Sequence, residues 1–194
     1  MAEEDVGKRM GRALYGDGLT ELFAAVLFFL LAAAWDVGGL PTILVGVGAL
    51  FGVKALGSVR ERVVHRRIGY AVPASEDAAT LGSGMAITTI AVIGGGLFVA
   101  WYVGDVALIR TWVAAIAGAL VAAGIWYLAG RSQLVRHRVL AMATILWGFV
   151  ATVTWGDDGY SSLVPFFVGL GVAFGVVGAW SLVAFLRSHP ERPA

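Results

Sequence analysis

The chain has 194 residues, of which 59% are hydrophobic and 14% are charged, and its formal net charge is +1. Soluble domains have roughly a quarter charged residues, so this composition, with a mean hydropathy of +0.82, excludes an ordinary water-soluble protein. The charge deficit comes from long apolar runs, each close to the ~20 residues that cross about 30 Å of hydrocarbon. We therefore interpret the chain as an integral membrane protein. Cysteine is absent, which excludes disulfides and thiolate sites.

The apolar runs predict an all-α integral membrane protein with six transmembrane helices. A polar segment, residues 1–16, comes first and has no apolar stretch or cleavage site of a signal peptide. The expected spans are roughly Gly18–Trp35, Pro41–Gly57, Leu81–Val103, Ile109–Gly130, Val139–Trp155 and Ser162–Leu186. Residues 17–187 then form one membrane domain, and residues 188–194 form a short tail.

The six spans read as three tandem helical hairpins, residues 17–57, 81–130 and 139–187. Each odd-numbered span ends near a tryptophan and an aspartate. Each even-numbered span is rich in small residues and closes on positive charge with one histidine nearby, namely His65, His137 and His189. Because arginines flank two of these histidines, we do not expect them to bind a metal cation. The pattern predicts a six-helix bundle whose hairpins share one orientation.

Small residues at four-residue spacing lie on one face of the even-numbered spans. Ala114, Gly118 and Ala122 form one such row, and Gly171 and Gly175 form another. Helices in lipid associate mainly through close backbone approach, so these rows predict the contacts of the bundle core.

Positive charge is concentrated at one end of the predicted spans. The N-terminal segment, the loop Ser58–Thr80, the loop Arg131–Arg138 and the tail hold nearly all lysines and arginines, which predicts that both termini are cytoplasmic in the inner membrane. We expect this basic face to contact anionic lipid headgroups through Arg60, Arg62, Arg66, Arg67, Arg131, Arg136 and Arg138. The residues expected in an aromatic belt at the opposite interface are Trp35, Trp101, Tyr102, Trp112, Trp155 and Tyr160.

Charges of both signs occur near the inner end of the first hairpin. Asp17 precedes the first span and is a candidate helix cap, because its carboxylate can accept hydrogen bonds from first-turn amides. Glu21 and Lys54 lie at matching depths on adjacent antiparallel spans and are a candidate ion pair. The pair could act as an ion-linked gate or as a structural pin. The pin is favoured because neither residue reaches the midplane, where transporter sites lie.

A second polar cluster is expected in the opposite turns. It combines one cation with several carboxylates, and its members are Asp36, Asp105, Arg110, Asp157 and Asp158. The cluster could bind a cation, but a solvated rim is the simpler interpretation.

The middle of the membrane is expected to hold little polar chemistry. Thr88, Thr89, Thr144 and Thr152 can hydrogen-bond back to their own helices. Motifs for zinc and for a nucleophilic serine are missing from the sequence, so we expect a protein without catalytic activity and without a cofactor.

Two resemblances add to this interpretation. The stretch Gly16–Glu21, with the later run Arg66-Arg67-Ile68-Gly69-Tyr70, resembles a family of uncharacterised prokaryotic multi-span proteins with an Asp-Gly-Leu-x-Glu start and a Pro-Arg-Ile-Gly-Tyr loop. Arg66 stands where that family has proline, and the resemblance implies no activity. The three-hairpin layout is similar to that of HdeD-like acid-resistance membrane proteins.

These features favour a structural or accessory membrane protein that binds lipid or protein partners through its basic cytoplasmic face. Membrane lipids are the expected partners, and a homo-oligomer or a larger membrane complex is left open. Nucleic acid is not expected as a partner, because the basic residues lie directly next to the ends of the spans. The alternative is a small transporter or channel for a neutral or lipid-like solute, built around the glycine-rich helices.

Overall fold

The computed structural model describes residues 16–36, 52, 55–65, 106–132 and 134–190. All regular structure in these residues is helical, and no strand occurs among them. Within the described residues, four helices are long and apolar enough to cross a membrane, at Leu19–Asp36, Arg110–Gly130, Val135–Trp155 and Tyr160–Ser188. The described chain is therefore helical, with helices of the length and hydropathy of membrane spans, as its composition predicts. Most of the predicted second span and all of the third lie outside the described residues.

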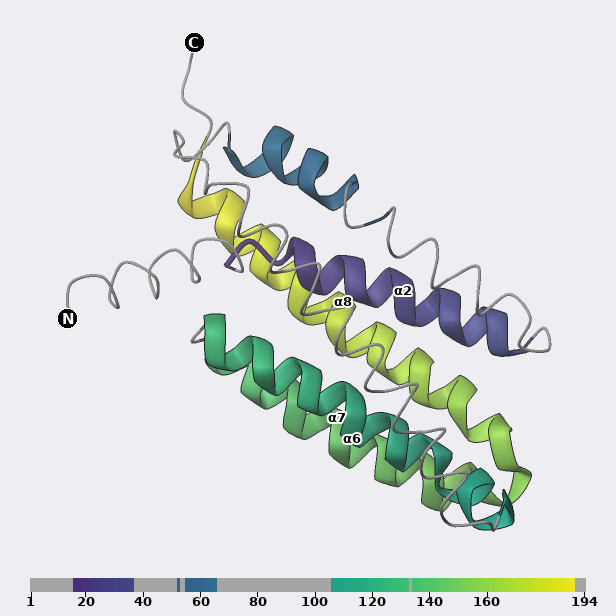
Figure 1. Cartoon of the computed structure of the whole chain (residues 1–194). Helices are drawn as coiled ribbons and strands as arrows, with labels where there is room; N and C mark the ends of the chain where they lie inside the picture. Colours follow the sequence, from purple (N-terminus) through teal and green to yellow (C-terminus); the bar gives the residue numbers. More distant parts are fainter. Residues whose placement is uncertain (1–15, 37–51, 53–54, 66–105, 133, 191–194) are drawn as a thin grey trace. The chain divides into compact units, whose positions relative to one another are not determined.

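The helices follow the apolar runs of the sequence (Figure 1). The long ones are α2 (Leu19–Asp36), α6 (Val106–Ser132), α7 (Val135–Trp155) and α8 (Leu163–Ser188). Two short helices complete the described chain, a π-helix η1 (Glu61–His65) that continues helical residues 55–60, and a 3-10 helix η2 (Gly156–Ser162) between α7 and α8.

Several helices run further than the apolar runs suggest. The helix before η1 and η1 itself occupy residues expected to begin the polar loop at Ser58. Likewise, α7 begins at Val135 rather than at Val139, so Arg136, His137 and Arg138 form part of its first turn instead of a loop. Arginine is a good helix former, and its long side chain can reach polar surroundings from within a helix. Charge therefore marks the edge of the membrane and not the end of the helix.

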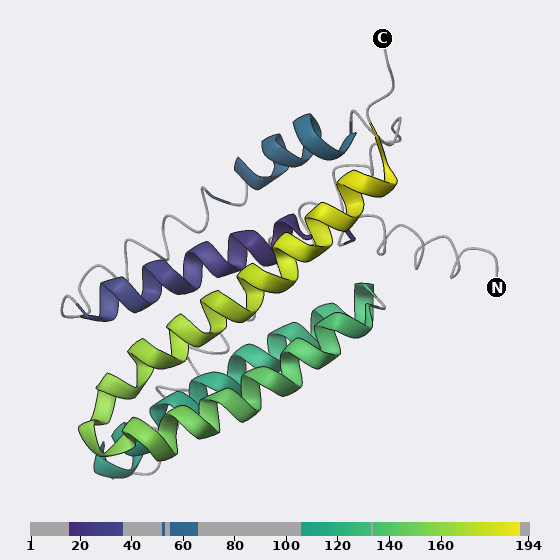
Figure 2. The same cartoon turned by 180° about the vertical axis from the view of Figure 1, so that it is seen from behind.

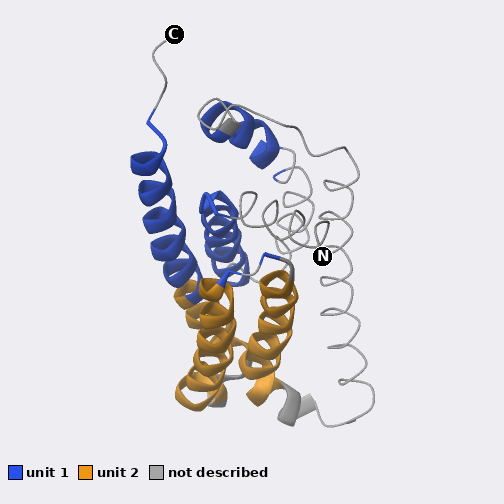
Figure 3. Ribbon diagram, turned by 90° about the vertical axis from the view of Figure 1, so that its left-hand side faces the viewer, with its two compact units in different colours: residues 1–72, 131–134, 170–194 blue, residues 73–130, 135–169 orange. Residues whose placement is uncertain are grey.

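The chain divides into two compact units (Figure 3). Unit 1 consists of Met1–Val72, Arg131–Leu134 and Leu170–Ala194, and unit 2 consists of Pro73–Gly130 and Val135–Gly169. The first turns of α8 thus belong to unit 2, and the rest of that helix belongs to unit 1.

In unit 1, α2 packs closely against α8, and both views of the chain show the two helices side by side (Figure 1, Figure 2). A Cβ added to Gly178 would lie 2.8 Å from the Leu22 nitrogen and 2.9 Å from the Gly18 carbonyl oxygen. Further along the same antiparallel contact, Gly175 lies next to Ala25. Only glycine allows the backbones to approach this closely, so small residues determine where these helices meet.

The same packing joins α6 and α7 in unit 2. A Cβ on Gly148 would lie 2.8 Å from the Ala114 carbonyl oxygen, and one on Gly118 would lie 3.0 Å from the Thr144 carbonyl oxygen. Ala114 and Ala122, from the predicted row of small residues, are buried here. This contact joins the fourth and fifth predicted spans, which the sequence pattern assigns to different hairpins.

Two polar contacts strengthen unit 2. The Thr152 hydroxyl accepts a hydrogen bond of 2.9 Å from the Ala115 backbone amide on the neighbouring helix. The Trp147 indole N–H donates to the Pro165 and Phe166 carbonyl oxygens at 3.3 and 3.2 Å. Thr144 bonds back to the Leu140 carbonyl oxygen of its own helix, as predicted. For Thr152 the structure instead shows a bond between helices, because the close α6–α7 approach brings an amide of α6 within its reach.

Large apolar side chains remain exposed along one face of α7. This row consists of Val139, Met142, Leu146, Phe149 and Val153. Such a continuous apolar surface is unfavourable in water and favourable in hydrocarbon. Its position on a helix of membrane-spanning length supports the interpretation of α7 as a transmembrane helix.

The close contact of α6 with α7 makes a testable prediction. We expect Gly148→Ala to lower the free energy of unfolding by about 1–3 kcal/mol, because the new methyl group would overlap the α6 backbone. The measurement is unfolding of the purified protein in detergent. The matched control is Gly130→Ala, where an added Cβ meets nothing within 4 Å. Equal stabilities of the two variants would contradict the close packing.

Candidate functional site

The candidate site lies where α2 begins, in unit 1. Gly18 has a φ of 78°, a left-handed conformation that glycine adopts without strain, and α2 follows directly. The Leu22 amide donates the first helical hydrogen bond to the Gly18 carbonyl oxygen at 3.1 Å. An added Cβ at Gly18 would also fall on the Gly178 carbonyl oxygen of α8. This turn therefore needs glycine for two independent reasons.

Asp17 precedes this turn, and its side chain is fully buried. Its Oδ1 accepts a hydrogen bond of 3.0 Å from the Leu19 backbone amide. That amide belongs to the first turn of α2, where no helical carbonyl is available to accept it. Asp17 thus satisfies an amide at the start of α2 from a position just outside the helix.

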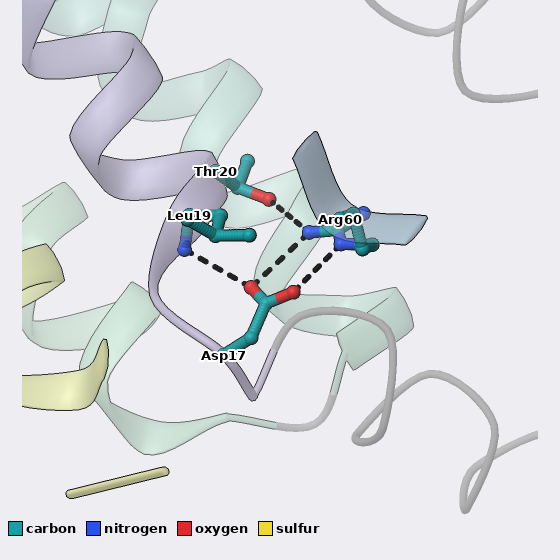
Figure 4. Close-up of polar contacts among 4 residues, drawn as sticks. All are labelled: Asp17, Leu19, Thr20 and Arg60. Atoms are coloured by element: carbon teal, nitrogen blue, oxygen red, sulfur yellow. Dashed lines mark hydrogen bonds and ion pairs between the residues drawn. The ribbon is translucent and has the colours of Figure 1, made fainter. Parts of the chain in front are cut away.

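Arg60 holds the same carboxylate from the segment that leads into η1 (Figure 4). Its Nε lies 2.6 Å from Asp17 Oδ2, and its Nη2 lies 3.2 Å from Asp17 Oδ1. The Nη2 also donates to the Thr20 hydroxyl at 3.0 Å. The Arg60 side chain is 11% exposed, and the two paired residues are 43 positions apart in the sequence. We call the set Asp17, Thr20 and Arg60 the arginine clamp.

The clamp joins two antiparallel segments. A Cβ on Gly52 would collide with the ring of Phe23, so residue 52 lies one to two turns deeper along α2 than Arg60 does. The two-point contact of a planar guanidinium with a carboxylate fixes both distance and orientation. The clamp therefore holds the segment containing Arg60 against the start of α2.

Glu21 lies one turn into α2 and is 2% exposed. A carboxylate in the first turn of a helix is stabilised by the partial positive charge of the helix N-terminus. Its predicted partner Lys54 lies outside the described residues, so the Glu21–Lys54 pair stays a prediction. The buried ion pair that the structure does describe is the one between Asp17 and Arg60.

The predicted headgroup-binding arginines occupy different surroundings. Arg60 is directed into the clamp, whereas Arg62 and Arg138 are exposed and Arg136 is partly buried. Arg66 and Arg67 lie outside the described residues, and the side chain of Arg131 is not described. Contact with lipid headgroups remains a prediction for this set.

The expected polar cluster in the opposite turns is described only in part. The guanidinium carbon of Arg110 lies 5.5 Å from the centre of the Tyr160 ring. Asp36 is exposed at the end of α2 in unit 1. Asp105 lies outside the described residues, and for Asp157 and Asp158 only the backbone, in η2, is described.

Two members of the clamp have roles that the sequence analysis missed. Arg60 was assigned to lipid headgroups, and Thr20 was not considered. The depth argument that pairs Glu21 with Lys54 did not reach Arg60, because the predicted span ends at Gly57 and Arg60 was assigned to the loop that follows. Comparisons with family models, with curated proteins and with solved structures gave no match.

Removal of one partner tests the energetic role of the clamp. We expect Asp17→Ala to lower the free energy of unfolding by about 3 kcal/mol, because it leaves the largely buried Arg60 without its carboxylate. The double variant Asp17→Ala/Arg60→Ala should cost roughly 1–3 kcal/mol less than the sum of the single variants. The measurement is a double-mutant cycle of unfolding in detergent.

The matched control is Glu61→Ala, which removes an exposed carboxylate next to Arg60. It should change the stability by less than about 0.5 kcal/mol. Additive costs of the two clamp substitutions would show that Asp17 and Arg60 do not stabilise one another.

Proposed function

We propose that the protein is a non-enzymatic integral membrane protein with a structural or accessory role, binding lipid or protein partners through a basic face. Its six spans form three tandem hairpins in the cytoplasmic membrane, with both termini on the cytoplasmic side. This proposal agrees with the resemblance to multi-span proteins that begin with Asp-Gly-Leu-x-Glu. In unit 1 the basic face comprises the arginines at the end where α2 begins.

One observation carries the proposal, namely that the clamp fixes the segment from which Arg62 projects. Arg60 is engaged by Asp17 and Thr20, and Arg62, two residues further on, is exposed. Arg187 is exposed near the end of α8, beyond the Gly178 contact with the start of α2. In unit 1 the same end therefore carries exposed cations on two elements that are packed against α2.

A fixed cation binds an anionic partner with a smaller entropic cost than a cation on a mobile loop. Anionic headgroups attract each arginine near the surface by about 1 kcal/mol. The clamp thus holds the segment that carries Arg62 in a fixed position without using the exposed arginines themselves. A structural role for the buried pair and a binding role for the exposed residues are compatible.

The proposal is tested by the lipids that the purified protein retains. We expect Arg62→Gln/Arg187→Gln to lower the preference for phosphatidylglycerol over phosphatidylcholine by roughly fivefold per arginine, since 1 kcal/mol corresponds to about that ratio. Native mass spectrometry of the protein in maltoside with equal amounts of the two lipids provides the measurement.

Glu61→Gln is the control, because it removes an exposed charge of opposite sign from the same segment. It should leave the preference unchanged or raise it. A wild-type protein with no preference for the anionic lipid, or a double variant with an unaltered one, would overturn the lipid-binding role.

A further inference from the structure

Unit 2 carries an exposed arginine at the end where η2 lies. Arg110, in α6, is exposed, and its guanidinium carbon lies 5.5 Å from the centre of the Tyr160 ring, which belongs to η2. The two residues are brought together by the packing of α6 with η2, since a Cβ on Gly156, the first residue of η2, would lie only 3.0 Å from the Thr111 carbonyl oxygen. Tyr160 is itself 42% exposed, so this corner of unit 2 is accessible.

The pair lies near the ends of two helices of membrane-spanning length. Arg110 is the fifth residue of α6, and Tyr160 lies in η2, just before α8. Close to the pair, Trp112 on α6 is 40% exposed, and Trp155, at the end of α7, is 37% exposed. Partly exposed tryptophan and tyrosine rings are typical of the headgroup level of a bilayer. We therefore expect Arg110 at the depth of lipid phosphates.

The geometry suits a phosphate group. A guanidinium has five N–H donors in a rigid planar fork that matches phosphate oxygens in two-point contact. Contact with an aromatic face uses the π-side of the cation and leaves the donors at its edge available. Tyr160 can thus hold the guanidinium in place while the edge binds an anion.

We propose that Arg110, positioned by Tyr160, binds the phosphate of a phospholipid headgroup in the leaflet at this end of unit 2. Phospholipid is the favoured source of phosphate because Trp112 and Trp155, at the same end of unit 2, have the partial exposure that is typical of rings at headgroup depth. The site goes beyond the basic face of the proposed function and uses none of its arginines.

Photolabelling tests the proposal in phosphate-free maltoside micelles. One probe is phosphatidylglycerol with a diazirine in its headgroup, and the other is a diacylglycerol with the same diazirine and no phosphate. We expect the phospholipid probe to label peptides containing Trp112 or Tyr160 roughly fivefold more than the diacylglycerol probe does, the ratio for one arginine near a headgroup. Arg110→Ala should reduce the phospholipid labelling to the level of the diacylglycerol.

Three variants separate this site from general effects. Arg138→Ala removes an exposed arginine of α7 near the opposite end of unit 2 and should leave labelling of the Tyr160 peptide unchanged. Tyr160→Leu should reduce the labelling of the Trp112 peptide, whereas Tyr160→Phe should restore it because the ring is retained. Labelling of peptides from the basic face should be the same in all Arg110 and Tyr160 variants, which also shows that these variants are folded.

Three results would overturn the inference. Equal labelling by the two probes would show that the phosphate is not recognised. Undiminished labelling in Arg110→Ala would assign the contact to other groups, such as the belt tryptophans. Complete displacement of the phospholipid probe by inorganic phosphate would identify a site for free anions rather than for lipid.

Discussion

Close approach of helix backbones is the constraint on which the described structure depends. In hydrocarbon, little hydrophobic force acts between helices, so they must gain contact area through short distances. Gly178 and Gly18 allow this in unit 1, and Gly118 and Gly148 allow it in unit 2. The interhelical bond from the Ala115 amide to the Thr152 hydroxyl exists only because the second pair brings two backbones together. Small residues thus position the few polar contacts of the apolar region.

The arginine clamp depends on charge compensation rather than on close backbone approach. Asp17 is fully buried, and a buried carboxylate is tolerable only when its charge and its lone pairs are satisfied. Arg60 provides the opposite charge with two donors, and the Leu19 amide provides a third. Glycine at position 18 makes this possible, because it lets the chain turn sharply into α2 while the backbone lies against α8. The packing of the chain against α8 and the charge compensation of Asp17 therefore both depend on the turn at Gly18.

Polar chemistry in the described residues is found mainly where helices begin and end. The clamp lies at the start of α2, and Arg110 with Tyr160 lies near the start of α6 and just before α8. The two arrangements differ in one physical respect. Arg60 is 11% exposed and bound to an internal carboxylate, whereas Arg110 is exposed against an aromatic ring. The first arrangement stabilises the fold, and the second leaves hydrogen-bond donors for a ligand.

The sequence by itself determined that the described chain is helical and located its four helices of membrane-spanning length, because length and hydrophobicity are local properties. Gly18–Trp35 was predicted for α2, which the structure places at Leu19–Asp36. The start of α7 was placed too late, because charge marks the membrane edge and helices continue past it. The partner of Asp17 and the acceptor role of Thr152 were decided only by the tertiary structure. Periodicity and charge in the sequence give the position of a residue along its own helix. Which residue of another helix becomes its partner depends on which helices pack together, and glycine decides where two helix backbones can approach each other.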